Sequence, residues 1–235
     1  MNKRNKYMKI SIITITFNSA KTLQRALASV QGQTYREIEH ILVDGASTDG
    51  TRDMIAAYAK THPNVRWVSE KDNGIYDALN KGIAMATGEV VGFLHSDDVL
   101  FAPDSIEHIA AVFESEQADV VYGDLQYCRG NRVVRHWKSN DFNLCALKYG
   151  WMPPHPTVYV RRAVYEQVGP YDDWFRISAD YDMMLRIFSA GYKTKYIPEV
   201  IVSMETGGAS NKNTKARLSK TQEDSIVLNK NHIGC

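Results

Sequence analysis

The feature that most constrains the fold of this chain is the regular alternation of short apolar runs with amphipathic segments in its first hundred residues. The apolar runs are rich in β-branched residues and predict buried strands over residues 9–17, 38–43, 65–68 and 89–94. The segments between them have helical spacing, over 21–31, 51–60 and 74–86. Strands that alternate with helices in this way predict an α/β fold with a doubly wound, mainly parallel sheet, whose ligands bind beyond the carboxyl ends of the strands.

The pattern changes after residue 100. Helices are predicted over 104–116, 141–149, 179–190 and 214–229, and extended segments over 119–127, 133–138, 157–160 and 193–204, the last interrupted at Pro198. This order predicts a mixed rather than a parallel arrangement. Because neither a repeat nor a linker separates the halves, we expect residues 1–235 to form one domain, with halves at about 9–100 and 101–210 and a C-terminal tail or helix at 211–235.

Composition excludes some classes of partner. The 28 Lys and Arg residues balance 27 Asp and Glu residues, so the net charge of +1 gives no argument for binding nucleic acid. A hydrophobic content of 44% over 235 residues is enough for a substantial core. The apolar stretch 10–17 is too short to span a bilayer or to act as a secretion signal, and we therefore expect a cytoplasmic protein.

Two acidic residues follow the fourth predicted strand directly. Asp97 and Asp98 come after a run in which Val91 and Phe93 are expected to be buried, so their carboxylates would be held at the edge of the sheet. Mg²⁺ and Mn²⁺ commonly take one or two protein carboxylates and complete their coordination with water and phosphate oxygens. The pair therefore predicts a metal site for a nucleoside diphosphate, although Asp is also common in turns that follow strands.

Polar residues also follow the first and second strands. Thr16, Phe17 and Asn18 are placed to cradle a base through backbone groups and one aromatic ring. Asp44 can accept hydrogen bonds from a ribose or from a base N–H group. Asp49 precedes a predicted helix, and we assign it to capping that helix.

The helix predicted over 74–86 adds weaker candidates for binding the same ligand. Asn73 precedes this helix, and Asp77 and Asn80 lie within it on related sides. Asp77 and Lys81 also have the spacing of an ordinary surface ion pair, which is the plainer interpretation for both.

Three candidates lie in the second half. His155 is bracketed by Pro154 and Pro156, which fix it in a loop where a site is more plausible than a core, and it can contact a phosphate or an acceptor. Asp180 and Asp182 begin a predicted helix, so both can stabilise its N-terminus. Asp180 can equally be a general base that removes a hydroxyl proton, and Asp182 can contact the acceptor or the diphosphate. The spacing allows both interpretations.

Taken in order, these segments resemble the family 2 glycosyltransferases from about residue 9 to residue 210. The matching motifs occupy residues 14–18, 43–51, 72–74 with 78–82, 86–89, 94–98 and 179–182. Their order along the chain is the specific part of the resemblance, because a chance match of six ordered motifs is improbable.

The resemblance implies a GT-A fold, an inverting transfer from a nucleotide-sugar donor, and a metal cofactor, Mn²⁺ or Mg²⁺. It implies that Asp44 contacts the base or the ribose, that Asp97 and Asp98 serve the ribose and the metal–diphosphate, and that Asp180 is the catalytic base. Residues 9–100 then form the nucleotide-sugar-binding half and 101–210 the acceptor-side half. The remaining donor-site candidates by this resemblance are Thr16, Phe17, Asn18, Asn73, Asp77 and Asn80.

Two positions depart from the family pattern. His95 stands where the family often has the first Asp of its D-x-D motif, which leaves metal binding to Asp97 and Asp98. Ala179 replaces the frequent Glu before Asp180. The Q-x-x-R-W motif of processive synthases is absent from the sequence, which favours transfer of a single sugar.

The segment 72–82 most resembles bacterial enzymes that build surface or capsular polysaccharides. This resemblance predicts a UDP-sugar donor and, as acceptor, a hydroxyl of a glycan or of a lipid-linked oligosaccharide. The basic residues 1–9 and the pair Arg161 and Arg162 allow peripheral attachment at the inner face of the cell membrane, although scattered solvated charge is the plainer interpretation.

Two other functions compete with this one. A nucleotidyltransferase shares a related fold and metal carboxylates, but the chain has no Gly-rich loop with Arg and Lys after its first strand to hold a triphosphate. A glycosyltransferase-like module that binds a nucleotide or a partner protein without turnover is compatible with His95. The presence of Asp97, Asp98 and Asp180 argues against that alternative.

Overall fold

In the computed structural model, which describes residues 7–130, 132–147, 149–206 and 214–231, nine strands form one mixed sheet. The strand order is β3-β2-β1-β4-β8-β6-β9-β5, and β7 pairs with β6 alone. The strands span Ile10–Thr16 (β1), Ile38–Asp44 (β2), Val65–Ser69 (β3), Val90–Phe93 (β4), Val99–Leu100 (β5), Val120–Arg129 (β6), Arg132–Trp137 (β7), Tyr159–Arg161 (β8) and Thr194–Glu205 (β9).

The first four strands form the parallel part of the sheet. β1 lies between β2 and β4, and β2 also pairs with β3, all in parallel, as the sequence predicts. Thr16 is the register partner of Asp44, and Asp44 is the partner of Ser69. The carboxyl ends of these strands therefore meet at one edge, because parallel neighbours in register end side by side.

The remaining strands make the arrangement mixed, as expected. β8 joins the two parts, since it pairs antiparallel with both β4 and β6. Thr157 was expected in this strand but lies in a 3₁₀ turn, His155–Thr157 (η1), so β8 begins two residues later. β9 runs through Pro198 without the predicted break, because its register with β6 shifts near this residue and no ladder bond is required from the proline nitrogen.

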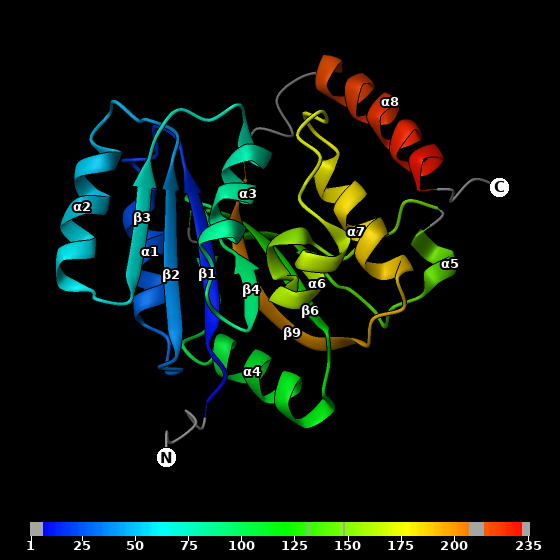
Figure 1. Cartoon of the computed structure of the whole chain (residues 1–235), viewed down its shortest axis with the longest axis horizontal. Coiled ribbons are helices and arrows are strands. Elements are labelled where there is room, and N and C mark those ends of the chain that lie inside the picture. Colours follow the sequence, from blue (N-terminus) through cyan, green and yellow to red (C-terminus); the bar gives the residue numbers. More distant parts are fainter. Residues whose placement is uncertain (1–6, 131, 148, 207–213, 232–235) are drawn as a thin grey trace.

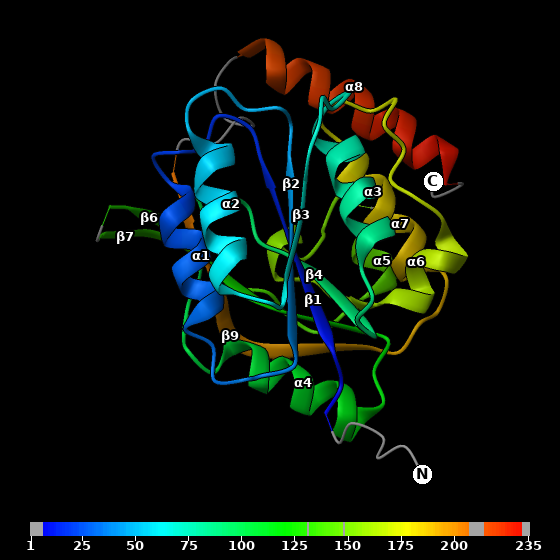
Figure 2. The same cartoon turned by 60° about the vertical axis from the view of Figure 1, so that its left-hand side comes forward.

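The helices cover both faces of the parallel strands, with α1 and α2 on one face and α3, α6 and α7 on the other (Figures 1 and 2). They span Leu23–Gln31 (α1), Thr51–Thr61 (α2), Ile75–Met85 (α3), Ser105–Glu116 (α4), Leu144–Leu147 (α5), Arg162–Val168 (α6), Ala179–Ser189 (α7) and Thr214–Lys230 (α8). The sequence did not predict β5 or α6, and α5 is much shorter than the predicted 141–149.

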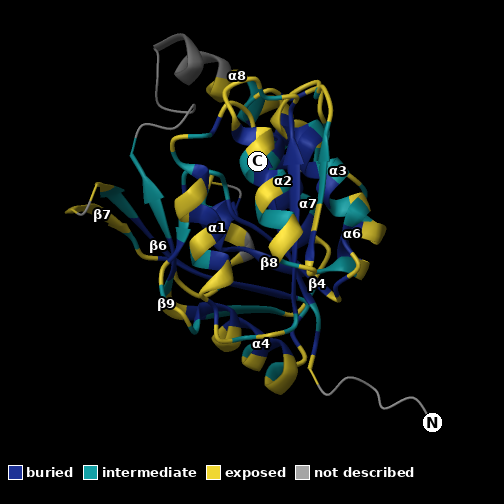
Figure 3. Cartoon of the chain, turned by 90° about the vertical axis from the view of Figure 1, so that its left-hand side faces the viewer, coloured by how far each residue is buried: buried dark blue, intermediate teal, exposed yellow. Residues whose placement is uncertain are grey.

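The alternation of side chains along β1 divides the core into two layers. Ile10 and Ile12 join the cluster that includes α1 and α4, whereas Ile13 and Ile15 join the cluster that includes α3 and α7. Figure 3 shows that the central strands are buried and that exposed residues lie on the outer faces of the helices and on β7. Within the described ranges, no helix has the length and apolar character that crossing a bilayer requires.

Candidate functional site

The carboxylate of Asp44 is fully buried at the end of β2. It accepts hydrogen bonds from the hydroxyls of Thr16, at 2.9 Å, and Ser69, at 2.7 Å, and from both the amide and the hydroxyl of Ser47. Burial alone would raise the pKa of Asp44, but these hydrogen bonds outweigh it and lower the pKa. These hydrogen bonds tie the ends of β1, β2 and β3 together, and the expected contact of Asp44 with a base or a ribose stays a prediction.

Phe17 and Asn18 form the exposed rim beside this buried carboxylate. The Phe17 ring is 68% exposed, while Thr16 just before it is only 4% exposed. Asn18 adopts a φ of 50°, donates its amide to the Ser47 hydroxyl and accepts from the amide of Thr48. The rim is therefore a fixed turn that presents one aromatic ring to solvent.

Asp49 stabilises the start of α2, as the sequence predicts, from the position just before the N-cap residue Gly50. Its Oδ1 accepts hydrogen bonds from the backbone amide and the hydroxyl of Thr51, the first residue of α2. Its other oxygen accepts from the amide of Ala20, so the same carboxylate also fixes the loop after β1.

The acidic pair at the end of β4 has an unusual environment. Asp98 is fully buried, and neither of its carboxylate oxygens has a hydrogen-bond partner among the described residues. Burial, and then the charges of Asp97 and Glu205, raise the pKa of Asp98 well above its usual range, and the nearby backbone amide of Glu205 offsets only part of this rise. Asp97 itself is partly exposed, and the Ser96 hydroxyl anchors their loop to the Ser19 hydroxyl at 2.9 Å.

This pair fits a hard divalent cation, because a buried carboxylate without partners is costly unless a positive charge neutralises it. In the part of the chain that the structure describes, no three His, Cys, Asp or Glu side chains converge in a group that could hold a metal. The pair therefore fits a cation that is held by only two protein carboxylates and that completes its coordination with water and phosphate oxygens.

His155 does not lie in the open position that its flanking prolines suggested. His155 is 7% exposed, and its ring stacks on that of Phe93 with 5.2 Å between the ring centroids. Its Nε2 lies 2.7 Å from the hydroxyl oxygen of Tyr171. Burial lowers its pKa to about 3, so the ring is neutral. The structure corrects the expectation here: Pro154 and Pro156 fix this turn inside the core, where apolar rings from β4 and the segment before α7 enclose the imidazole.

Polar residues of α3 mostly bind other parts of the protein. Asp77 accepts from the amide of Asn73 at 2.9 Å and forms the expected ion pair with Lys81 at 3.2 Å. The Asn80 side chain donates to the carbonyl of Tyr171 and accepts from its amide. Asn80 therefore fastens α3 to the segment that precedes α7.

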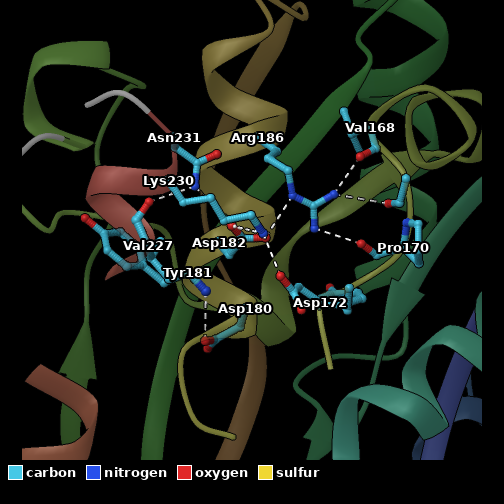
Figure 4. A network of polar contacts seen from close by, with 12 residues as sticks. Val168, Pro170, Asp172, Asp180, Tyr181, Asp182, Arg186, Val227, Lys230 and Asn231 are labelled. Atoms are coloured by element: carbon cyan, nitrogen blue, oxygen red, sulfur yellow. Dashed lines mark hydrogen bonds and ion pairs between the residues drawn. The ribbon is translucent and has the colours of Figure 1, made fainter. Parts of the chain in front are cut away.

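The two aspartates at the start of α7 have different surroundings, which Figure 4 shows. Asp182 is fully buried and contacts Arg186, Lys230 and Asn231 at 2.9–3.1 Å. Asp180 stays partly exposed and accepts a hydrogen bond from the amide of Tyr181. Burial raises the pKa of Asp180. Residues two apart on a helix face different sides, which separates the Asp182 network from the Asp180 carboxylate.

Sequence reasoning missed the contribution of α8 to this region. The Glu223 carboxylate accepts hydrogen bonds from the backbone amides of Arg176, Ile177 and Ser178, at 2.9–3.2 Å. The Ser178 hydroxyl donates to Asp224 at 2.7 Å. The start of α7 is therefore capped by side chains that lie about 45 residues away in sequence, and no local motif marks them.

Comparison with known proteins places these features in context. A family model described as "Glycosyl transferase family 2" matches residues 11–178. A PGL/p-HBAD biosynthesis glycosyltransferase of Mycobacterium tuberculosis is 37% identical over 208 residues, which cover 86% of this chain and 78% of the relative. An uncharacterized glycosyltransferase of Nostoc is 34% identical over 229 residues, which cover 92% and 70%.

Solved structures share the fold at low sequence identity. TarS residues 1–349 from S. aureus, in complex with UDP-GlcNAc, align with a TM-score of 0.74 and 18% identity over 94% of this chain and 66% of that one. The mannosyltransferase PcManGT from Pyrobaculum calidifontis, in complex with GDP-Man and Mn²⁺, gives a TM-score of 0.70 and 21% identity over 96% and 64%. The chain spans 42% of a longer TarS structure. This likeness confirms the predicted GT-A type of α/β fold.

Proposed function

The chain belongs to glycosyl transferase family 2, and on that premise we propose that it is an inverting enzyme that transfers a single sugar from a nucleotide-sugar donor to an acceptor hydroxyl. The observation that carries the proposal is the acidic pair Asp97 and Asp98, because a carboxylate with no hydrogen-bond partner among the described residues lies where a parallel sheet binds its ligand. A buried, unpaired carboxylate serves folding poorly, so its presence at this edge favours a role toward a ligand.

We place the donor nucleotide against the exposed rim at the ends of β1 and β2. Phe17 and Asn18 would contact the base, and Asp97 the ribose or the diphosphate. Thr16 and Asp44 would support this surface from below, since both are buried. The TarS complexes with UDP and UDP-GlcNAc favour a UDP-sugar, and the PcManGT complex makes a GDP-sugar the main alternative.

Asp97 and Asp98 would hold Mn²⁺ or Mg²⁺, whose chemistry when bound is to offset the negative charge that develops on the departing diphosphate. The charge environment of the pair suits this role. Asp98 is buried beside Asp97, so their ionised forms repel each other unless a cation lies near them.

Asp180 is the proposed catalytic base. Its carboxylate would accept the proton of the acceptor hydroxyl while the hydroxyl oxygen forms a bond to the anomeric carbon and the bond from that carbon to the diphosphate breaks. Attack from the face opposite the leaving group inverts the anomeric configuration. The raised pKa of Asp180 suits general base catalysis, which is most effective when the pKa of the base approaches the working pH.

We further propose that the acceptor is a glycan or a lipid-linked saccharide. We also propose that the enzyme works in the cytoplasm and can attach peripherally to the inner face of the membrane. The resemblance to polysaccharide-building enzymes supports the acceptor class, and the mycobacterial relative is named for PGL/p-HBAD biosynthesis. Arg161 and Arg162 support attachment only weakly, because Arg161 donates to the Ala118 carbonyl and Arg162 pairs with Glu166.

The test of this proposal is release of nucleoside diphosphate, with transfer of the sugar to water or to an added saccharide, from purified protein given UDP-GlcNAc, UDP-glucose, UDP-galactose or GDP-mannose with Mn²⁺. We expect release from one donor and its loss in Asp180→Asn. Pyrophosphate release from a nucleoside triphosphate and a sugar phosphate would instead identify a nucleotidyltransferase. Release that is unchanged in Asp180→Asn would contradict the assigned base.

A further inference from the structure

A cavity of about 740 Å³ lies between the start of α3 and the segment that leads into α7. Its walls include residues 73–77 on one side, 173–176 on the other, and Glu223 of α8. Neither Phe17 nor the acidic pair Asp97 and Asp98 belongs to this lining. The cavity therefore does not include the rim to which the proposed function assigns the base, whereas Asn73 and Asp77, two of the donor-site candidates from the sequence, belong to its lining.

The walls of this cavity combine an aromatic surface with polar groups. Trp174 is 65% exposed and Ile75 is 45% exposed. The buried ring of Phe175 packs edge-on against the indole, with 5.1 Å between the ring centroids. Asp173 and Arg176 lie on the same wall as the indole. An exposed aromatic face beside hydrogen-bonding groups suits a ligand that has apolar and polar surfaces, as a sugar ring does.

The lining of the cavity is linked to the segment that leads to the proposed catalytic base. Tyr76 lines it and donates its hydroxyl to the Ile177 carbonyl at 2.6 Å, three residues before Asp180. Burial, and then the charge of Asp180, raise the pKa of Tyr76, which agrees with a short separation between these side chains. The hydrogen bond from Tyr76 therefore connects the lining of the cavity to the turn that leads into Asp180.

The wall that carries Trp174 is held in place from two sides. Glu223 accepts from the amides of Arg176 and Ile177, and Asp172 accepts from the amide of Trp174 at 3.1 Å. Lys230 pairs with Asp172 at 2.7 Å. The binding surface is thus preorganised, which lowers the entropy cost of binding a ligand.

We propose that this cavity is the acceptor subsite and that its ligand is a saccharide whose apolar face stacks on Trp174. This inference rests on the proposed function, since it assigns the acceptor side of the same reaction. The exposed ring of Phe17 lies outside this lining and remains available for the donor base, so the two aromatic residues would serve different substrates.

The experiment measures binding of phenyl glycosides of glucose, galactose, mannose and N-acetylglucosamine by ligand-observed NMR, with dissociation constants from titration. We expect saturable binding of at least one glycoside, about tenfold weaker binding in Trp174→Ala, and near-normal binding in Trp174→Phe. Tyr149→Ala is the matched control, because Tyr149 is exposed and lies outside the cavity lining. UDP affinity should stay within twofold in all three variants.

Three results would overturn the subsite. They are no saturable binding of any glycoside, unchanged glycoside binding in Trp174→Ala, or a loss of UDP affinity in Trp174→Ala that exceeds the loss of glycoside affinity. The last result would assign the cavity to the donor nucleotide instead. Diphosphate release from the donor is measured separately and does not depend on any of these results. Failure of the subsite and failure of the proposed function are therefore distinguishable.

Discussion

The carboxylate of Asp182 lies 2.9 Å from Nε of Arg186, one turn later on α7, and it is fully buried there. Arg186 also donates to the carbonyls of Val168 and Pro170. Lys230 of α8 reaches the same carboxylate at 3.1 Å. Asp182 therefore joins α7, α8 and the segment before α7, whereas Asp180, two residues earlier, keeps its carboxylate apart from this network (Figure 4).

Asp182→Asn should therefore lower stability more than it affects chemistry. Removing one charge of a buried ion pair leaves the other uncompensated, and we expect a loss of roughly 3 kcal/mol in the free energy of unfolding. Urea denaturation followed by circular dichroism measures this loss. Arg186→Met in the Asp182→Asn background should restore part of it, and an unaltered urea midpoint in Asp182→Asn would contradict the structural role.

Asp180→Asn should behave in the opposite way. If Asp180 is the base, the rate of sugar transfer falls by about 10²–10⁴-fold. Because its pKa is raised in the folded state, the folded protein binds the proton more tightly than the unfolded chain does, and the ionised carboxylate opposes folding at neutral pH. The amide removes this cost, so the melting temperature at pH 7 should equal or exceed that of the parent protein. A variant that is both active and less stable would refute the assignment.

The rate of transfer should depend on pH through Asp180. The base works only when ionised, so the rate falls as pH decreases through its pKa. Because burial raises this pKa, the acidic limb of the pH–rate profile lies at higher pH than for an ordinary Asp. Lys220 lowers this pKa and Asp224 raises it, and these two residues pair at 2.7 Å. Tyr76 and Tyr171 also lie near enough for the Asp180 charge to raise their pKa values.

Lys220→Met should move the acidic limb to higher pH, because it removes the positive charge and leaves Asp224 unneutralised. The profile of kcat against pH measures the shift. Lys195→Met provides a control, since Lys195 pairs with Glu116 at 2.7 Å, on a different surface. Movement of the limb to lower pH in Lys220→Met would contradict the proposed base.

The acidic pair makes a prediction about cation binding. Asp98→Asn should abolish stabilisation by Mn²⁺ in the presence of a nucleoside diphosphate, since a ligand that binds the native state raises its apparent stability. Glu39→Gln should keep the Mn²⁺ response, although Glu39 is equally a buried acid, because Ser11 and Thr87 hydroxyls already bind its oxygens at the far end of β1 and β2. A full Mn²⁺ response in Asp98→Asn would exclude this carboxylate as a ligand.

The sequence predicted most of the parallel half because local pattern determines it. β1 to β4 begin and end within one or two residues of the expected positions, and Asp97 lies at the expected edge. Burial of individual polar residues was harder to predict. The donors that enclose Asp44 come from three separate segments, and the rings that enclose His155 come from β4 and the segment before α7. Such surroundings depend on tertiary packing.

The contacts of α8 were the hardest to predict from the sequence. Glu223 and Lys230 have the appearance of solvated charges on a helix, but they bind backbone amides and aspartates of the segment 172–182. Their partners lie about 45 residues or more away, and neither spacing nor composition identifies them. The same network occupies the carboxylate of Asp182. A contact of Asp182 with the acceptor or the diphosphate, as predicted, would have to replace one of these contacts.

Thermal-shift binding of UDP, GDP, CDP and dTDP to the purified protein, each with Mn²⁺ and with a chelator, tests most directly whether the candidate site binds a nucleotide. We predict that one diphosphate, expected to be UDP, raises the melting temperature with Mn²⁺, and that this effect is lost with the chelator, in Asp97→Ala and in Asp98→Ala. Stabilisation by none of the four diphosphates under either condition would contradict the claim that this edge of the sheet binds a nucleotide-activated sugar.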